Sequence, residues 1–315
     1  MIVRWSLDDL SATLAEVGIE RPFLIASPRW QFLELPQVAS WSEIPSHRVQ
    51  VPEHADGILV VGGGSAVDTG KFASAESGKP VVHVPTTYSG AEWTTSFGVR
   101  SPDRVIRGAG SGARPVAIIY DVSLTLELPA DVTAGTSLNG LAHCAEALYV
   151  QGHGAEGDEE ALDGARLIST SLPRVLAEPG DRAAREELLR GAAHAGHALA
   201  LNRLGLAHAM AQALGGTYGL PHGAMNALCL PPALEFNSRF VPAEVARFGE
   251  AIGGDAAGRS RELALLGGFD RLRDFGVPED ELAQVADAAA QRGGNQANPQ
   301  PASPAEILEL YRGIY

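Results

Sequence analysis

Three histidines in the helical part of the chain are placed where they could form a divalent-metal site. His143 lies in the segment SLNGLAHCAEALY, together with Asn139 and Glu146. Their spacing of four and then three residues puts all three side chains along one face of a helix. His208 falls on a second helical segment, and His222 follows the turn after it. Three imidazoles with an oxygen ligand could hold a divalent metal, whereas each histidine taken alone could equally be a satisfied core residue.

A glycine-rich turn in the first half has the residue types of an anion-binding site. The apolar run Ile58–Val61 predicts a buried parallel strand, and three glycines with Ser65 separate it from a helical segment. Glycines allow close approach of the backbone, and the N–H groups and dipole of a helix N-terminus favour phosphate or pyrophosphate. The run GGGSAVD is not the GxGxxG fingerprint. It predicts a phosphate cradle or, alternatively, a tight turn that binds nothing.

Three hydroxyl side chains follow the next predicted strand, Pro80–Val84. They belong to Thr86, Thr87 and Ser89. Ligands of open parallel sheets bind beyond the carboxyl ends of the strands, so these hydroxyls are candidates for binding a cofactor. The alternative is a polar loop whose hydroxyls cap their own backbone.

Four arginines gather in one short stretch of an otherwise acidic chain, at positions Arg100, Arg104, Arg107 and Arg114. Guanidinium groups bind carboxylates and phosphates through paired hydrogen bonds, so Arg104 and Arg107 are candidates for holding an acidic substrate. The same run could instead be a solvated hairpin.

The elements that must position these residues change in kind near the middle of the chain. In the first half, strands alternate with helical segments, which predicts an open parallel sheet in an α/β domain. Residues 27–51 show no clear period and predict only a brief helix and one further strand. From Ala130 onward, helical periods rich in Ala, Leu and Glu predict an all-helical region. We therefore expect an α/β domain over residues 1–127 and an all-helical domain over residues 128–315. The other elements expected in the first half are a helix over Leu7–Val17 and strands over Phe23–Ala26 and Val116–Tyr120.

The composition is that of a globular protein and excludes several kinds of partner. The chain has 315 residues, 45% of them hydrophobic, which is enough for a sizeable core. A net charge of −14 argues against nucleic-acid and anionic-membrane partners, since both need a positive field. Only Cys144 and Cys229 are present, which favours a reducing cytoplasm over a disulfide framework. We also expect neither a secretory leader nor a membrane span, because no apolar run is long enough.

Five motifs in a fixed order resemble the iron-containing alcohol dehydrogenase superfamily and, within it, the maleylacetate reductases. They are GGGSAVDTGK, PTTYSGAEWT, YDVSLTLELP, SLNGLAHCAEALY and HAMAQALGGTYGLPHGAMNALCLPPALEFN. The resemblance implies a dinucleotide-binding domain followed by an all-helical domain, with the active site between them. It also implies NADH or NADPH as cofactor, a small-molecule substrate and assembly as a homodimer.

The same resemblance assigns roles to individual positions of the cofactor site. Gly63, Gly64 and Ser65 match the turn that binds pyrophosphate, Asp68 lies in that motif, and Thr86, Thr87 and Ser89 match the loop that holds the adenosine and nicotinamide side. Where the family usually has an acidic residue after its first strand, this chain reads Ala26-Ser-Pro28. Without a carboxylate for the ribose hydroxyl, the choice between NADH and NADPH stays open.

The metal ligands of the iron-dependent members, an Asp and three His, fall on Asn139, His143, His208 and His222. An Asn carbonyl is neutral, so the protein would offer an ion no compensating charge. Maleylacetate reductases also carry Asn there and are regarded as metal-independent. The resemblance therefore implies a metal-free site, with zinc on the three histidines as the exception.

Two departures from the family concern the active site and the N-terminal domain. Gln212 stands where another histidine usually lies near the nicotinamide, and an amide cannot relay a proton near neutral pH. Only some 25 residues separate Ser27 from Val51, so a crossover helix is expected to be missing.

We expect a metal-independent reductase that transfers hydride from NAD(P)H to a carbonyl or conjugated enone of a small carboxylate. His143, His208 and His222 are the expected hydrogen-bond donors or positioners, with Asn139 and Gln212 as neighbours. Arg104 and Arg107 are expected to hold the substrate carboxylate. The alternatives are a metal-dependent alcohol dehydrogenase and a non-redox descendant of the same scaffold, such as a cyclase, an isomerase or a binding protein.

Overall fold

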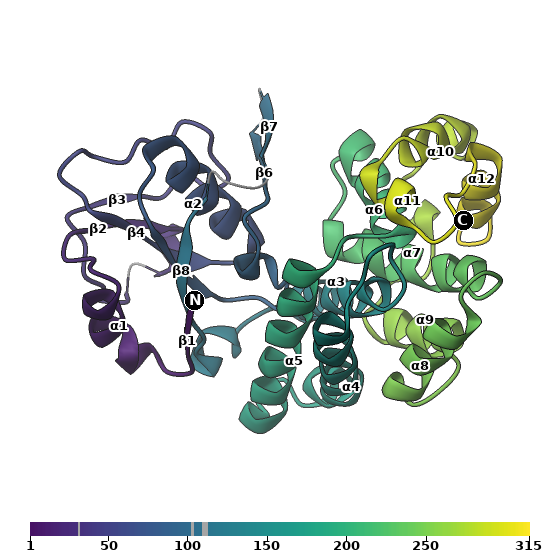
Figure 1. Cartoon of the computed structure of the whole chain (residues 1–315), viewed down its shortest axis with the longest axis horizontal. Coiled ribbons are helices and arrows are strands. Elements are labelled where there is room, and N and C mark those ends of the chain that lie inside the picture. Colours follow the sequence, from purple (N-terminus) through teal and green to yellow (C-terminus); the bar gives the residue numbers. More distant parts are fainter. Residues whose placement is uncertain (31, 102–103, 109–112) are drawn as a thin grey trace. The chain divides into compact units, whose positions relative to one another are not determined.

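The computed structural model describes residues 1–30, 32–101, 104–108 and 113–315, and for residues 100, 101 and 104–107 it describes the backbone alone. The chain forms two compact units (Figure 1). The first consists of Met1–Thr87 and Ala91–Glu127, and the second of Tyr88–Gly90 and Leu128–Tyr315. Residues 88–90 thus group with the helical unit, although only two residues separate them from a strand of the first.

An open sheet of six parallel strands forms the centre of the first unit, as the alternating pattern predicts. The strand order is β1-β8-β5-β4-β2-β3. The strands are β1 (Ile2–Arg4), β2 (Pro22–Ala26), β3 (Ala39–Trp41), β4 (Gly57–Gly62), β5 (Val81–Pro85) and β8 (Pro115–Ile119). The edge strand β1 is too short to show a period in the sequence, and its pairing with β8 places it in the sheet.

Both faces of this sheet are covered, because the central strands are apolar on both sides. In β4, Leu59 and Val61 pack into one hydrophobic cluster, whereas Ile58 and Val60 pack into another on the opposite face. The first cluster includes residues of α1, and the second includes residues of α2. The predicted helix over Leu7–Val17 begins as a 3-10 turn, η1. The helical elements here are η1 (Leu7–Asp9), α1 (Leu10–Glu16), η2 (Pro28–Trp30), α2 (Gly64–Ser77), η3 (Ala91–Trp93) and η4 (Val122–Thr125).

The arginine-rich stretch forms an antiparallel hairpin of β6 (Phe97–Ser101) and β7 (Arg104–Gly108). This is the hairpin that the sequence offered as an alternative to an anion clamp. Arg104 and Arg107 lie on β7, but their side chains are outside the described part of the chain, so their predicted role in substrate binding stays a prediction.

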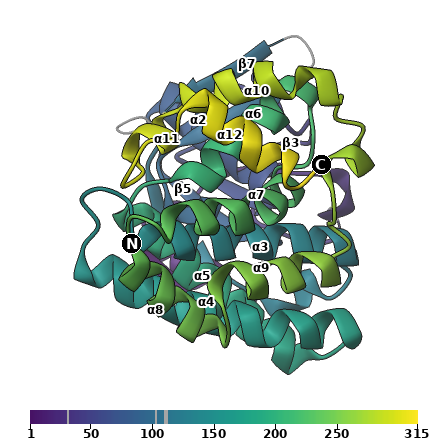
Figure 2. The ribbon, with the colours of Figure 1, turned by 90° about the vertical axis from the view of Figure 1, so that its right-hand side faces the viewer.

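The secondary structure of the second unit consists of helices joined by loops, without a strand, and all of its residues are described. Helix α3 lies at its centre and is buried at nearly every position from Thr133 to Ala147. Helices α10, α11 and α12 gather near α6 at one end of this unit (Figure 2). The helices are α3 (Ala130–Ala147), α4 (Ala155–Ala177), α5 (Arg182–Leu201), α6 (Leu206–Tyr218), α7 (His222–Asn237), α8 (Pro242–Ile252), α9 (Ala256–Leu266), η5 (Leu272–Phe275), η6 (Glu279–Glu281), α10 (Leu282–Ala290), α11 (Gly293–Ala297) and α12 (Pro304–Arg312). None of the helices in the described ranges is long and apolar enough to cross a membrane.

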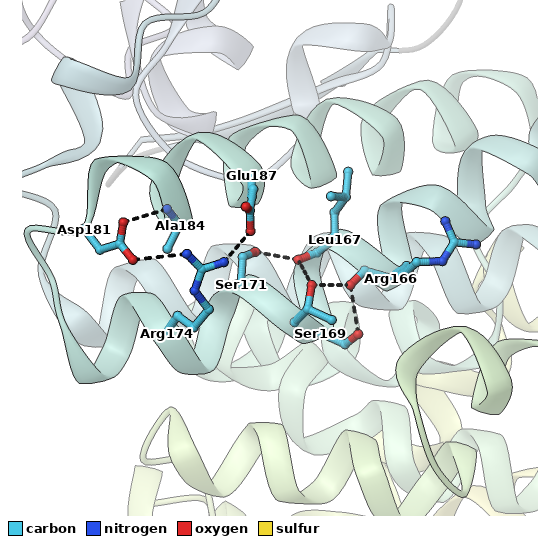
Figure 3. Close-up of polar contacts among 9 residues, drawn as sticks. Arg166, Leu167, Ser169, Ser171, Arg174, Asp181, Ala184 and Glu187 are labelled. Carbon is cyan, nitrogen blue, oxygen red and sulfur yellow. Dashed lines mark hydrogen bonds and ion pairs between the residues drawn. The ribbon is translucent and has the colours of Figure 1, made fainter.

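Helices α4 and α5 form an antiparallel pair that packs against α3. The connection between them is tied by Arg174, which forms ion pairs with Glu187 at 2.6 Å and with Asp181 at 3.2 Å (Figure 3). Asp181 also caps α5 by accepting a hydrogen bond from the backbone N–H of Ala184. Each partly exposed ion pair contributes little, so the buried face against α3 dominates the packing.

Candidate active site

A close approach of two helices brings the predicted site residues of the second unit together. Asn139 and His143 lie on α3, and His222 opens α7. A Cβ atom on Gly223 would lie 2.3 Å from the carbonyl oxygen of Gly135 on α3. Only a glycine lets the start of α7 approach α3 so closely. The glycine after His222 therefore places this histidine beside the polar face of α3.

The three histidines form one cluster, as their joint pattern predicts. The rings of His143 and His208 are stacked, with centroids 4.7 Å apart and an interplanar angle of 16°. The ring of His222 is tilted against His208, with a centroid distance of 5.7 Å. His143 and His208 are buried. The three rings therefore contact one another inside the second unit, and whether they are functional or satisfied core histidines depends on their hydrogen-bond partners.

Two asparagines fix the orientation of this cluster. Nδ2 of Asn139 donates to the carbonyl oxygen of Ser89 at 3.1 Å, and the same nitrogen lies 3.4 Å from Nε2 of His143. Because an amide nitrogen only donates, Nε2 of His143 must accept and its proton must be on Nδ1. Oδ1 of Asn139 accepts from Nδ2 of Asn226 at 2.7 Å, and Asn226 faces Nε2 of His222 at 3.0 Å. By the same reasoning, Nε2 of His222 is an acceptor.

A buried carboxylate fixes the third histidine. Oε2 of Glu146 lies 2.6 Å from Nδ1 of His208, and Oε1 accepts from the backbone N–H of His208 at 3.0 Å. Both side chains are almost completely inaccessible. Three polar atoms of the cluster have no hydrogen-bond partner among the described residues, namely Nδ1 of His143, Nε2 of His208 and Oδ1 of Asn226. Nδ1 of His143 is a donor and Oδ1 of Asn226 is an acceptor, and together with Nε2 of His208 they are the atoms available to a ligand.

Burial sets the charge state of the site. It lowers the pKa of His143 well below the usual value, and His208 and His222 lower it further. His143 is therefore a neutral imidazole near pH 7. Burial also raises the pKa of the thiols of Cys144 and Cys229, and the charge of Glu146 adds to the effect on Cys229. Neither thiol is a thiolate nucleophile at neutral pH.

The glycine turn of the first unit has the geometry of an anion cradle. Strand β4 ends at Gly62, and α2 begins at Gly64, with Gly63 as its N-cap in an extended conformation. Gly63 provides no side chain to cap the helix, so the first N–H groups of α2, including that of Ser65, are left for a ligand or solvent. A Cβ on Gly63 would lie 2.7 Å from Cγ2 of Thr87. Only a glycine at position 63 therefore lets the turn pack this closely against Thr87 without a shift.

The other predicted cofactor residues differ in their contacts. The backbone N–H of Thr86 donates to the carbonyl of Gly62 at 3.0 Å, which ties the ends of β5 and β4 together. The hydroxyl of Thr87 is buried without a partner in the described part of the chain. Asp68 accepts from the N–H of Gly98, which holds α2 against β6, and it forms an ion pair with Lys71 within α2. Ser89 contributes its carbonyl to Asn139 in the second unit.

Two residues of the histidine cluster have roles that the sequence reasoning missed. The sequence puts Glu146 on one helical face with His143 but does not indicate its partner His208, and it gives Asn226 no predicted role. The signal for Asn226 was its spacing of four residues from His222, which puts both on one face of α7.

Gln212 lies one turn after His208 on α6 and is partly exposed. Within the described residues, no group of three or more His, Cys, Asp and Glu side chains is arranged as a metal site.

Comparison with known proteins places the chain among dehydrogenases. The family model "Fe-containing alcohol dehydrogenase family, C-terminal" matches residues 133–315, and "Iron-containing alcohol dehydrogenase" matches residues 8–129. Maleylacetate reductase of Burkholderia cepacia is 35% identical over 265 residues, which cover 83% of this chain and 74% of that protein. Maleylacetate reductase 1 of Cupriavidus pinatubonensis is 30% identical, with 91% and 86% covered. The crystal structure of maleylacetate reductase from Agrobacterium tumefaciens superposes with a TM-score of 0.91 at 26% identity, covering 100% of this chain and 95% of that one.

These matches, together with the parallel sheet, the glycine turn and the helical second unit, define an NAD(P)-dependent oxidoreductase. The chain belongs to the iron-containing alcohol dehydrogenase family, and its similarity to maleylacetate reductases extends over most of its length. The resemblance inferred from the five motifs is confirmed.

Proposed function

We propose that this protein is a metal-independent, NAD(P)H-dependent reductase that acts on a carbonyl or conjugated enone of a small carboxylate. The similarity to maleylacetate reductases supports the substrate class. The arrangement of donors and acceptors around the histidines supports catalysis without a metal. In this reaction a hydride adds to the substrate, negative charge develops on the carbonyl oxygen, and a proton taken from solvent completes the product.

The observation that carries the proposal is the buried N–H of His143. Asn139 holds Nε2 of this ring as an acceptor, so Nδ1 carries the proton and has no partner among the described residues. The low pKa of His143 keeps the ring neutral. A neutral imidazole can donate a hydrogen bond to a developing oxyanion without losing its proton to solvent. We assign His143 this stabilising role.

The residues present do not fit a bound metal. Of the four atoms that correspond to metal ligands in iron-dependent relatives, three already face amide nitrogens. Oδ1 of Asn139 accepts from Asn226, and Nε2 of His143 and of His222 face Asn139 and Asn226 respectively. A cation would have to displace these amide hydrogens, and all four ligand atoms would be neutral. No step of the proposed mechanism uses a metal.

Each part of the chain has a task in this mechanism. NAD(P)H, when bound, supplies the hydride. The glycine turn with Gly63, Gly64 and Ser65 binds the pyrophosphate, and Thr87 offers its unpartnered hydroxyl to the cofactor. His143 stabilises the oxyanion, while His208 and His222 position the substrate. The role of Arg104 and Arg107 in binding its carboxylate stays a prediction, because their side chains lie outside the described part of the chain.

A steady-state assay tests the proposal. After exhaustive treatment with chelator, the protein should oxidise NADH or NADPH in the presence of maleylacetate and contain no stoichiometric metal. His143→Leu should lower kcat about 100-fold or more, since it removes one oxyanion donor. His194→Leu, at a partly exposed position on α5, is the matched control and should retain full activity. Loss of activity with the chelator, restored by zinc or iron, would contradict metal independence.

A further inference from the structure

We propose that Glu146 is a positioning residue that holds His208 in a single tautomer, with the proton on Nδ1 and the lone pair of Nε2 presented to the substrate. The inference rests on the proposed function in one respect, namely that the lone pair of Nε2 interacts with the substrate of a reductase. The proton on Nδ1 itself follows from the geometry of the second unit alone.

The two hydrogen bonds of Glu146 to His208 place a proton on Nδ1 and fix the orientation of the ring. A carboxylate only accepts hydrogen bonds, and Oε2 lies 2.6 Å from Nδ1, so Nδ1 must carry a proton. Oε1 holds the backbone N–H of the same residue at 3.0 Å. One carboxylate therefore fixes both the backbone and the ring of His208. Because both side chains are nearly inaccessible, water does not compete for these bonds.

Glu146 also takes the place of a helix cap. His208 is the third residue of α6, and its N–H is one of those left without an acceptor inside the helix. The N-cap residue, Gly205, has no side chain to accept it. A Cβ on Gly205 would lie 3.1 Å from the carboxyl carbon of Glu146, so this glycine makes room for the carboxylate. The negative charge is placed favourably at the positive end of the α6 dipole.

Capping alone does not require a carboxylate at position 146. A glutamine could accept the backbone N–H with its single oxygen, but its amide nitrogen would then face Nδ1 of His208 as a donor. The proton of His208 would have to move to Nε2. The residue type at position 146 thus selects which face of the imidazole accepts hydrogen bonds.

The consequence for the reaction is a matched pair of atoms on stacked rings. His143 offers an N–H donor and His208 offers a lone pair, and the ring centroids are 4.7 Å apart. A hydroxyl group both donates and accepts, so this pair is complementary to an alcohol or enol, the kind of group that forms when a carbonyl is reduced. We infer that His208 accepts the hydrogen of that hydroxyl group, while His143 donates to its oxygen.

Nitrogen-15 NMR of the full-length protein, labelled at histidine, tests the tautomer directly. We expect the wild-type signal of His208, assigned by its loss in His208→Gln, to show a protonated Nδ1 and an unprotonated Nε2. In Glu146→Gln we expect the reverse. Glu160→Gln is the matched control, because Glu160 lies 2.6 Å from Nδ1 of the partly exposed His194. It should leave the His208 signal unchanged.

The outcomes separate this inference from the proposed function. A wild-type His208 protonated at Nε2, or an unchanged signal in a folded Glu146→Gln, would overturn it. If Glu146→Gln does not fold, the wild-type spectrum decides alone. In a folded variant we expect kcat to fall roughly 10- to 100-fold, the range for residues that orient a functional imidazole, with the Kd of NADH unchanged. If the wild type reduces no carbonyl or enone but shows the expected tautomer, the positioning role stands and the proposed function is wrong.

Discussion

Nδ2 of Asn226 donates to Oδ1 of Asn139 across 2.7 Å, and this contact joins α7 to α3 inside the histidine cluster. The amide of Asn226 also faces Nε2 of His222, so its N–H groups interact with two atoms that a metal would need. In effect, amide hydrogens with partial positive charge satisfy the lone pairs in place of a cation. The carbonyl of Ser89 determines this arrangement, because it fixes which end of the Asn139 amide faces His143.

Asn139→Asp should therefore create affinity for a divalent metal. A carboxylate at this position adds a charged oxygen ligand to three imidazoles and can no longer donate to Nε2 of His143. We expect the variant to bind cobalt or zinc in a one-to-one ratio, measured by elemental analysis and by the visible absorption of cobalt. Asn139→Ser, which adds no charge, serves as the control and should bind no more metal than the wild type. Equal metal content in all three proteins would show that charge at position 139 does not control binding.

The glycine turn gives a prediction about cofactor affinity. In Gly63→Ala the new methyl group would lie 2.7 Å from Cγ2 of Thr87, and one of the two must shift. We expect the Kd of NADH, measured by fluorescence titration, to rise at least about tenfold, a loss of about 1.4 kcal/mol. Gly180→Ala is the control, since a Cβ there meets nothing within 4 Å among the described residues. If both variants bind NADH like the wild type, the turn is not the pyrophosphate site.

Local patterns predicted most of the fold. The apolar runs of β2, β4, β5 and β8 and the glycines after β4 are strong signals, because strands buried on both faces are continuously apolar. The strand β1 and the weak segment around β3 depend on pairing with neighbours distant in the chain. Strands of three residues, such as β1 and β3, are too short for the sequence to show a period.

The histidine cluster was predictable in membership but not in detail. The spacing of Asn139, His143 and Glu146 placed them on one helical face, and the motif order indicated that His208 and His222 join them. Which atoms accept and which donate depends on the carbonyl of Ser89 and on the amide of Asn226. Both come from other elements, so no spacing rule within α3 reveals them.

Stability at acidic pH should depend on His83. This residue is buried in β5, and neither ring nitrogen has a partner among the described residues. Burial, together with the charge of Lys71, lowers its pKa from 6.5 to about 3. The unfolded chain therefore takes up a proton near pH 6.5 that the folded chain refuses until about pH 3. The contribution of His83 to the free energy of unfolding is complete above this window. It is lost as the pH falls from about 6.5 to about 3, by about 1.4 kcal/mol per pH unit.

Urea denaturation at pH 7, 6 and 5 measures this dependence. We expect the free energy of unfolding of the wild type to fall more steeply below pH 6.5 than that of His83→Leu, which cannot bind the proton. His153→Leu controls for histidine replacement at a partly exposed position that pairs with Asp158. Parallel pH profiles of wild type and His83→Leu would mean that His83 finds a partner or water in solution.

The contact between Gly223 and Gly135 yields the last prediction. In Gly223→Ala the added methyl group would lie 2.3 Å from the carbonyl oxygen of Gly135, which is backbone and cannot rotate away. Helix α7 must then move from α3, at a cost of about 1–3 kcal/mol in the free energy of unfolding. The same movement lengthens the contact between Asn226 and Asn139, so kcat should fall although no cluster residue is replaced. Gly293→Ala, where a Cβ has no neighbour within 4 Å in the described ranges, should change neither quantity. A stable and fully active Gly223→Ala would show that the cluster tolerates a wider separation of the two helices than its hydrogen bonds suggest.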